Sequence, residues 1–530
     1  MNPAARALSL GPWRGATRNW PPHAPTLIAL LVCLGVLSPL AVTVYAALAG
    51  GLAHALHLLL RPIVAQLLLN TVGLALVTTL ASGILGVGVA WLVERSDLPG
   101  RRLWSVAAPL PLAIPAFIAS YAWLSTSVAF EGAAGAALVV TASYYPLVYL
   151  PVAAALRNMD PALEESARTM GCTPWRVFWR VVLPQLRPAL LGGMLLVILH
   201  VLAEFGAFSL LHFRTFTTAI YAEYTAGFAP DLGAMLACVL LVLCLFFLLL
   251  EARLRGRSSY ARTGPGARRP PLRYTLGPMR YLALSILAAV FVITLGVPLA
   301  TIAYWLTQHD AAAVTTASIA PARILSATLH SLGYGLLAGI ATTVLAIPVA
   351  YLATRFRQTF VQLIERATYL PRGMPGIVVG LALVTVSLRL LYPLYQSTGL
   401  LIAGYAIMFM PLALVSVRSS LEQVPVRLEQ SARVLGSTPL ESLRRVVLPL
   451  AAPGLGAAAA LVFISTCTEL TSTLLLAPTG AQTLATQVWA ASSTFAFASA
   501  APYAALLVGI SMLATWILAN RFGRAPAEAS

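Results

Sequence analysis

The chain contains no lysine, and its basic residues are 34 arginines and seven histidines. A Walker A loop, GxxxxGK[ST], needs a lysine that reaches the nucleotide phosphates, so this chain cannot carry one. If ATP drives this protein, we expect another polypeptide to bind the ATP. Charge is scarce as well: charged residues make up 10% of the 530 residues, against about 25% in a soluble protein.

Cysteine and histidine are sparse and scattered. The five cysteines form no CxxC pair and no metal-ligand spacing, and they are read as small apolar residues or free thiols. The seven histidines are scattered; His200 and Glu204 stand four residues apart and could pair, but one isolated pair without further catalytic groups is no full constellation for catalysis. We therefore predict no catalytic residues, no metal site and no cofactor, and we expect the protein not to be an enzyme.

Apolar residues dominate the rest of the chain, at 59% of the sequence with a mean hydropathy of +0.84. Only helices and closed barrels satisfy every backbone group inside a bilayer. Apolar stretches of roughly 20 residues without alternation are typical of helices. The sequence predicts an all-α polytopic membrane protein with about 12 transmembrane helices. The predicted spans are 26–49, 66–93, 103–128, 136–157, 189–212, 231–251, 281–306, 328–353, 369–391, 399–417, 454–477 and 501–520.

Arginines lie mostly in the connections on one side of these spans, which the positive-inside rule assigns to the cytosol. This placement accounts for the net charge of +17 without a nucleic-acid partner. Six spans in each half place both chain ends in the cytosol. The predicted organisation is a cytosolic N-terminal segment 1–25, a first repeat 26–251, an Arg-rich flexible cytosolic linker 252–280, a second repeat 281–520 and a cytosolic tail 521–530.

One polar segment occurs twice in the same register. The first copy reads EESARTMGCTPWRVFWRVVLP from Glu164, and the second reads EQSARVLGSTPLESLRRVVLP from Glu429, 265 positions later (429 − 164). These segments, 164–184 and 429–449, are called the first and second repeated loops. Prolines repeat too, which indicates two parallel repeats. The matching pairs are Pro111 with Pro371, Pro115 with Pro375 and Pro151 with Pro411.

Each repeated loop carries the signals of two short helices joined by a turn. Asp160-Pro161 is placed as an N-cap and first helical residue, and Gly171 as a stop. Thr173-Pro174, matched by Thr438-Pro439, starts the second helix. A single copy would be read as an amphipathic hairpin on the membrane surface. Two copies in register favour an element that docks on two copies of one partner.

The repeated loops resemble the EAA motif of binding-protein-dependent ABC importer permeases, in which E-A-A is followed by a Gly and then by Leu-Pro. The first copy reads Glu165-Ser166-Ala167, Gly171 and Leu183-Pro184; the second reads Gln430-Ser431-Ala432, Gly436 and Leu448-Pro449. Ser for the first Ala and Gln430 for Glu depart from the motif. The resemblance implies a bacterial inner-membrane protein with two cytosolic ABC ATPase subunits and a periplasmic binding protein as partners. The expected coupling residues are Glu164, Glu165, Ala167, Gly171, Glu429, Ala432 and Gly436.

Two carboxylates in the apolar spans, Glu204 and Glu469, also occupy matching positions. A carboxylate in a span usually faces a cavity or a partner. The pair either forms an acidic site for a cation on the translocation path or caps helix ends. Tyr221, Glu223 and Tyr224 are oxygen donors suited to a hard cation, or else interfacial aromatics and a solvated acid.

The segments that follow these carboxylates, 203–224 and 467–489, resemble the fused two-repeat permeases of ferric-iron importers. The predicted function is therefore the permease subunit of an ABC importer for ferric iron. Fused permeases for thiamine and for aminoethylphosphonate share this architecture and stay open as alternatives. The runner-up from another class is an ion-driven secondary transporter, which needs a proton or sodium relay within the bundle.

Overall fold

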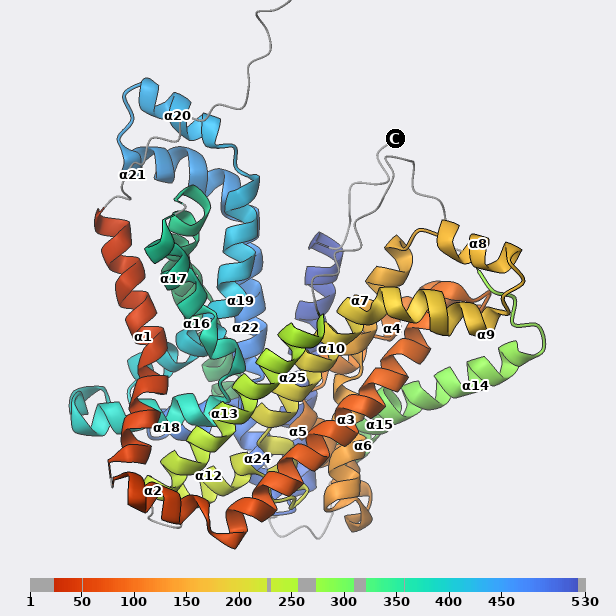
Figure 1. Cartoon of the computed structure of the whole chain (residues 1–530). Helices are drawn as coiled ribbons and strands as arrows, with labels where there is room; N and C mark the ends of the chain where they lie inside the picture. Colours follow the sequence, from red (N-terminus) through yellow and green to blue (C-terminus); the bar gives the residue numbers. More distant parts are fainter. Residues whose placement is uncertain are drawn as a thin grey trace, which may run out of the picture.

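The structure is a computed structural model, and it describes residues 23–49, 51–225, 230–255, 273–308, 321–356 and 358–522. In these ranges it is helical, with one isolated bridge between Ser96 and Tyr274 and no strand, as the sequence predicts (Figure 1). The helices stand mostly side by side. We call the face that carries the two repeated loops the loop face, and the other end of the helices the opposite face.

The first half runs from the N-terminal span to the start of the predicted linker. Its helices are α1 (His23–Leu48), α2 (Leu52–Leu59), α3 (Pro62–Arg95), α4 (Arg101–Ala107), η2 (Leu110–Ala113), α5 (Ala116–Thr126), η3 (Val128–Phe130), α6 (Ala133–Tyr144), α7 (Pro146–Asn158), α8 (Ala162–Thr169), α9 (Pro174–Val177), η4 (Phe178–Val182), α10 (Leu183–Ala203), α11 (Gly206–Leu210), α12 (Phe216–Thr225) and α13 (Pro230–Arg255).

The second half repeats this order of long and short helices. Its helices are α14 (Met279–Phe291), η5 (Val292–Gly296), α15 (Val297–Thr307), α16 (Pro321–Arg355), α17 (Thr359–Thr368), η6 (Leu370–Gly373), α18 (Gly376–Arg389), η7 (Tyr392–Leu394), α19 (Thr398–Gln423), α20 (Val426–Val434), α21 (Pro439–Ser442), η8 (Leu443–Val447), α22 (Leu448–Cys467), α23 (Thr471–Leu476), α24 (Leu484–Ser493) and α25 (Phe497–Phe522).

Ten described helices are long and apolar enough to cross a membrane, and up to twelve spans result if each of two bent pairs is one span. The bent pairs correct two predictions, because 103–128 and 369–391 are not straight helices. The chain bends by 89° between Ala113 and Ala116, and by 110° between Gly373 and Gly376. The repeated prolines cause both bends, since a residue before proline is pushed out of the helical region. Ile114 and Met374 are accordingly extended.

Each bent pair connects the two faces of the molecule. Arg95, at the end of α3, contacts Glu164 of α8, so α4 starts on the loop face. The span formed by α6 and α7 ends next to α8, so its first residue, Ala133, lies on the opposite face. The chain between Arg101 and Ala133 must therefore cross. The same reasoning applies between α16 and α19, so the bent pairs are broken spans.

Two more predicted spans are too long. The stretches 189–212 and 454–477 were expected to be continuous, but α10 ends at Ala203 and α22 ends at Cys467. Glu204 has extended ψ and its carboxylate caps the next short helix, α11. Glu469 does the same for α23. A polar residue that can bond the backbone offers the chain an alternative to continued helix, which explains both breaks.

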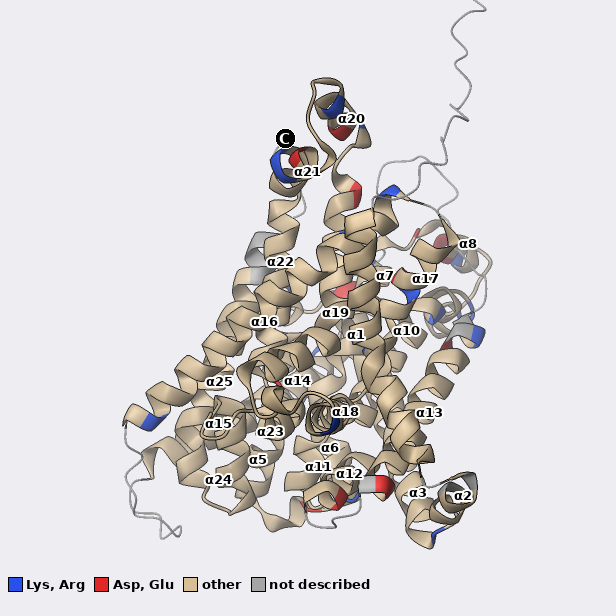
Figure 2. Ribbon diagram, turned by 90° about the vertical axis from the view of Figure 1, so that its left-hand side faces the viewer, with Lys and Arg blue, Asp and Glu red and all other residues tan. Residues whose placement is uncertain are grey.

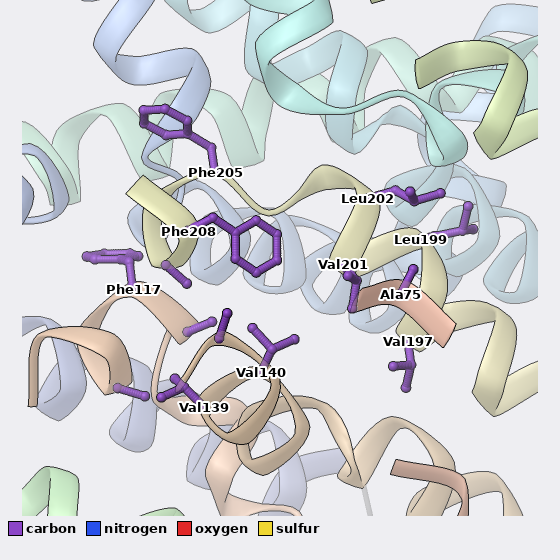
Figure 3. Close-up of a cluster of buried hydrophobic side chains, with 14 of the residues drawn as sticks. Ala75, Phe117, Val139, Val140, Val197, Leu199, Val201, Leu202, Phe205 and Phe208 are labelled. Atoms are coloured by element: carbon purple, nitrogen blue, oxygen red, sulfur yellow. The ribbon is translucent and has the colours of Figure 1, made fainter. Parts of the chain in front are cut away.

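The two halves are packed into one another. Helix α1 lies against α16, α17 and α18 of the second half, and α15 lies against α5 of the first. Phe208 of α11 lies close to Phe117 of α5 and to Val139 and Val140 of α6 in the larger buried cluster, whereas the Phe205 ring points away from them (Figure 3). Charged residues gather mostly near the ends of the helices (Figure 2).

Candidate functional site

Both repeated loops fold as the sequence predicts at their turns. The turns after α8 and α20 each contain a glycine in the left-handed region, with φ of 80° at Gly171 and 90° at Gly436. The hydroxyls of Thr173 and Thr438 then accept from backbone N–H groups at the start of the next helix. A residue with a Cβ is strained at such a φ, which explains why glycine stands at both turns.

Two local predictions on the loops need correction. Helix α8 begins at Ala162, not at Pro161, although Asp160 accepts a hydrogen bond from the Ala162 N–H at 3.1 Å. The second helix of each loop is also not a separate short helix. It continues through one π-helical turn into the following span, so that Pro174–Ala203 and Pro439–Cys467 are each one long helix.

Glu164 is fully buried and holds α8 against the end of α3. Its carboxylate lies 2.9 Å from the guanidinium of Arg95, and neither side chain is exposed. The hydroxyl of Tyr274, from the end of the predicted linker, donates to the second carboxylate oxygen at 3.2 Å. Burial and the Glu164 carboxylate raise the pKa of Tyr274, so this phenol keeps the proton that it donates.

Glu429 holds α20 in the same way. Arg355, at the end of α16, reaches its carboxylate at 3.2 Å, and the Tyr351 hydroxyl donates to it at 2.6 Å. Arg433 adds a third contact at 3.3 Å. Arg95 and Arg355 are 260 positions apart (355 − 95), the offset of the repeated prolines, so the two anchors are equivalent. The two glutamates therefore face inward and orient the loops.

The outward side of each loop is apolar at matching positions. Met170 and Leu435 are 76% and 86% exposed, and Trp175 and Leu440 are 70% and 73% exposed. Leu163 and Leu428 form a third exposed pair. Of the predicted coupling residues, Glu165 is exposed, Ala167 is buried and Ala432 is half-buried. Large apolar side chains left in the open on both loops indicate a surface that binds a protein.

Sequence reasoning missed the residues that anchor the loops, namely Arg95, Arg355, Tyr351 and Tyr274. Arg95 and Arg355 were counted only as positive charges at the ends of spans. Their matching positions, with an acidic residue repeated in each loop, were the signal that could have paired them. Tyr274 gave no such signal, because it is far from Glu164 in the sequence and has no repeat partner.

Glu204 and Glu469 come together in a cavity of about 370 Å³ between the two halves. The cavity is lined from α6, α10 and α11 on one side and from α22 and α23 on the other. The structure confirms that the two carboxylates cap helix ends and also places both on one cavity. Glu204 accepts from the Ala207 N–H at 2.9 Å and Glu469 from the Ser472 N–H at 3.0 Å, so each caps a short helix while it lines the cavity.

The two carboxylates differ in their second oxygen. The Tyr144 hydroxyl donates to Glu204 Oε2 at 2.6 Å, whereas no described residue donates a hydrogen bond to Glu469 Oε2. Tyr221, Glu223 and Tyr224 lie on α12 and are not among the residues that line the cavity. Among the described residues, no group of three or more His, Cys, Asp and Glu is placed to hold a metal ion.

The sequence of the chain matches a known family twice. The family described as "Binding-protein-dependent transport system inner membrane component" matches residues 82–258 and 342–525. The chain belongs to this family. It is a multi-pass inner-membrane permease with two repeats, and it is the non-catalytic membrane subunit of an ABC importer.

Relatives match this permease over different lengths. It is 36% identical over 502 residues to the Fe(3+)-transport system permease protein FbpB 2 of Haemophilus influenzae, covering 94% of this chain and 98% of that one. It is 25% identical over 431 residues to the probable ABC transporter permease protein y4fN of Sinorhizobium fredii, covering 72% and 74% of the two chains. It is 32% identical over 193 residues to the sulfate transport system permease protein CysT of Escherichia coli, covering 34% and 70%.

The loop glycines allow a direct test of the local fold. Gly171→Ala is expected to destabilise the end of α8 by about 1 kcal/mol, because the new Cβ is strained at positive φ. No atom lies within 4 Å of the position that this Cβ would take, so crowding is not the cause. Amide hydrogen exchange of α8 measures the loss. Gly88→Ala, in the open middle of α3, should leave α8 exchange unchanged; equal effects of both variants would contradict the argument.

Proposed function

We propose that this permease carries ferric iron inward, delivered by a periplasmic binding protein and powered by two separate ABC ATPase subunits. The relative that matches 94% of this chain is a permease of an Fe(3+)-transport system, and this likeness along nearly the whole length supports the proposal most strongly. The chain has two repeats, and each carries one repeated loop, so it can bind two copies of one ATPase subunit. The predicted bounds of the repeats, 26–251 and 281–520, remain part of the proposal.

The loop face is the cytosolic face in this proposal, with both chain ends on that side. Arginines gather in its connections, as the positive-inside rule requires. Each loop then presents its apolar side chains, led by Met170 and Trp175 or Leu435 and Leu440, to one ATPase subunit. Glu165 and Gln430 lie on the exposed side and add polar contacts, while Glu164 and Glu429 orient the helices. Gly171 and Gly436 set the turn that follows.

The cavity between the halves is the proposed translocation path. ATP binding brings the two ATPase subunits together, and the loops pass this movement to the spans that follow them, because α9 and α10 form one helix. The free energy enters as tighter binding of the closed ATPase pair to one state of the permease. Glu204 and Glu469 attract a cation into the cavity, and Tyr221, Glu223 and Tyr224 remain proposed as oxygen donors toward the outer entrance.

Neutralising either cavity carboxylate tests this path. Glu469→Gln and Glu204→Gln each keep an oxygen that can cap the short helix but remove the negative charge. We expect iron transport to fall about tenfold in each variant, the equivalent of ~1.4 kcal/mol. Uptake of radioactive iron into proteoliposomes measures the effect. Glu131→Gln is the control, since the Glu131 carboxylate pairs with His212 near the opposite face. Equal transport in all three variants would remove the carboxylates from the path.

The whole function is tested by reconstituting the permease with the ATPase and binding protein encoded beside it. ATP hydrolysis stimulated by the iron-loaded binding protein, and not by the iron-free form, is the expected result. An assembly that hydrolyses ATP but responds to thiamine or aminoethylphosphonate instead would keep the permease and change its substrate. If no ATPase subunit associates with the chain, the proposal that the two repeated loops couple it to two ATPase subunits fails.

A further inference from the structure

The two loop anchors are equivalent in their arginine and their glutamate but not in their tyrosine. In the second half, Tyr351 and Arg355 lie one turn apart on α16, and both bind Glu429. The position that matches Tyr351 in the first half is Trp91, since Trp91 and Arg95 have the same spacing on α3. The Trp91 ring packs against Phe178 at 4.9 Å and forms no hydrogen bond with Glu164 in the described structure.

Tyr274 supplies the hydroxyl that Trp91 does not have. It comes from the end of the predicted linker, and its hydroxyl donates to Glu164. Its ring lies 5.2 Å from the Trp91 ring on one side, and the Arg168 guanidinium lies 4.4 Å above it. Arg168 matches Arg433, which binds Glu429 directly in the second loop. The first loop therefore has an arginine at the end of an earlier span, a tyrosine and a second arginine around its glutamate, as the second loop does. Its tyrosine comes from another part of the chain.

The end of the linker is held where Tyr274 can reach Glu164. The Tyr274 N–H donates to the Arg95 carbonyl at 2.8 Å, and the Asp97 N–H donates to the Tyr274 carbonyl at 3.2 Å. The Leu276 N–H donates to the Asp97 carboxylate at 2.9 Å. These bonds fix segment 273–276 along the end of α3. The expectation that the whole linker is flexible therefore fails for this segment; residues 256–272 lie outside the described structure.

We propose that Tyr274 is a positioning residue of the first repeated loop, and that segment 273–276 ties this loop to the start of the second repeat. Helix α14 begins at Met279, three positions after Leu276 (279 − 276), so a shift of α14 acts on Glu164 and α8 through a short tether. The second loop shows no such tether among the described residues, and its tyrosine, Tyr351, comes from α16. The role in coupling rests on the proposed function; the anchor itself does not.

The anchor is tested on the purified chain alone, by amide hydrogen exchange in lipid nanodiscs. Tyr274→Phe removes only the hydroxyl and is expected to speed exchange in α8 about tenfold, as loss of a hydrogen bond to a charged group predicts. Exchange in α20 should not change. Tyr351→Phe is the matched control and should show the reverse pattern. If Tyr274→Phe leaves α8 exchange unchanged, Tyr274 does not position the loop.

A second variant separates this role from a general effect on stability. Trp91→Tyr combined with Tyr274→Phe places the hydroxyl on α3, where the second half has it, and should return α8 exchange toward the wild-type rate. If Tyr274→Phe instead loosens α8 and α20 equally, or the added tyrosine restores nothing, the hydroxyl is not an anchor of this loop.

Coupling is then measured on the assembled transporter as substrate moved per ATP hydrolysed. Tyr274→Phe is expected to lower this ratio several-fold while ATPase subunits still bind, and the combined variant should restore it. An unchanged ratio in a variant with a loosened α8 would overturn the coupling role. If even the wild-type chain binds no ATPase, the proposed function fails, and the exchange result still decides the anchor.

Discussion

Arg95→Met is expected to release the first repeated loop from the permease. Methionine is also long and unbranched, but it has no charge, so the Glu164 carboxylate stays buried without its cation. Breaking a buried ion pair on one side costs about 3–5 kcal/mol, which corresponds to a loss of roughly 100-fold or more in the population of the anchored loop. Iron transport should fall accordingly, and exchange of α8 amides should rise with little change in α20.

The double variant Arg95→Met with Glu164→Met tests whether the unpaired buried charge causes the loss. Replacing both partners by apolar residues is often nearly neutral, so the pair should recover much of the lost anchoring. Arg157→Met is the control, because Arg157 is 53% exposed and its partner Glu94 is 10% exposed, so solvent screens this pair more than the fully buried pair and the loss should be smaller. A double variant as loose as Arg95→Met alone would show that the buried charge is not what loosens the loop.

A charge on the exposed side of the loops is expected to prevent the ATPase subunits from binding. Met170→Asp and Leu435→Asp replace the most exposed matching pair of apolar side chains. If these residues are central to a protein interface, each aspartate must lose its water on docking, and losses of 2 kcal/mol or more are typical of such positions. We expect each single variant to weaken one of two binding events, and the double variant to lower affinity by roughly 100-fold or more.

The affinity is measured by titrating purified ATPase subunits onto the permease in nanodiscs. Val128→Asp places the same charge at an exposed apolar position near the opposite face, and it should bind the ATPase normally. Normal binding by the double variant, in a chain whose α8 and α20 exchange as in the wild type, would show that the ATPase docks elsewhere.

The sequence by itself determined the fold class, the two repeats and the turns of the loops. These features depend on local causes. Apolar stretches must be helices in a bilayer, and Gly171 and Gly436 suit the left-handed turn in which they lie. The two copies of the polar segment align without a gap, so the repeat can be recognised from the sequence without knowledge of any contact. The broken spans also have a local cause, because Pro115 and Pro375 occupy matching positions and each proline pushes the residue before it out of the helical region.

Only the tertiary structure decided which carboxylates are buried and what binds them. Glu164 and Glu165 are neighbours in sequence, yet one is paired with Arg95 inside the protein and the other is exposed. Glu204 and Glu469 both cap helices and share a cavity, since the packing of the halves brings α11 and α23 to one place. Tyr274 reaches Glu164 over 110 positions of sequence. Such contacts depend on how distant helices pack, and no local pattern specifies that packing.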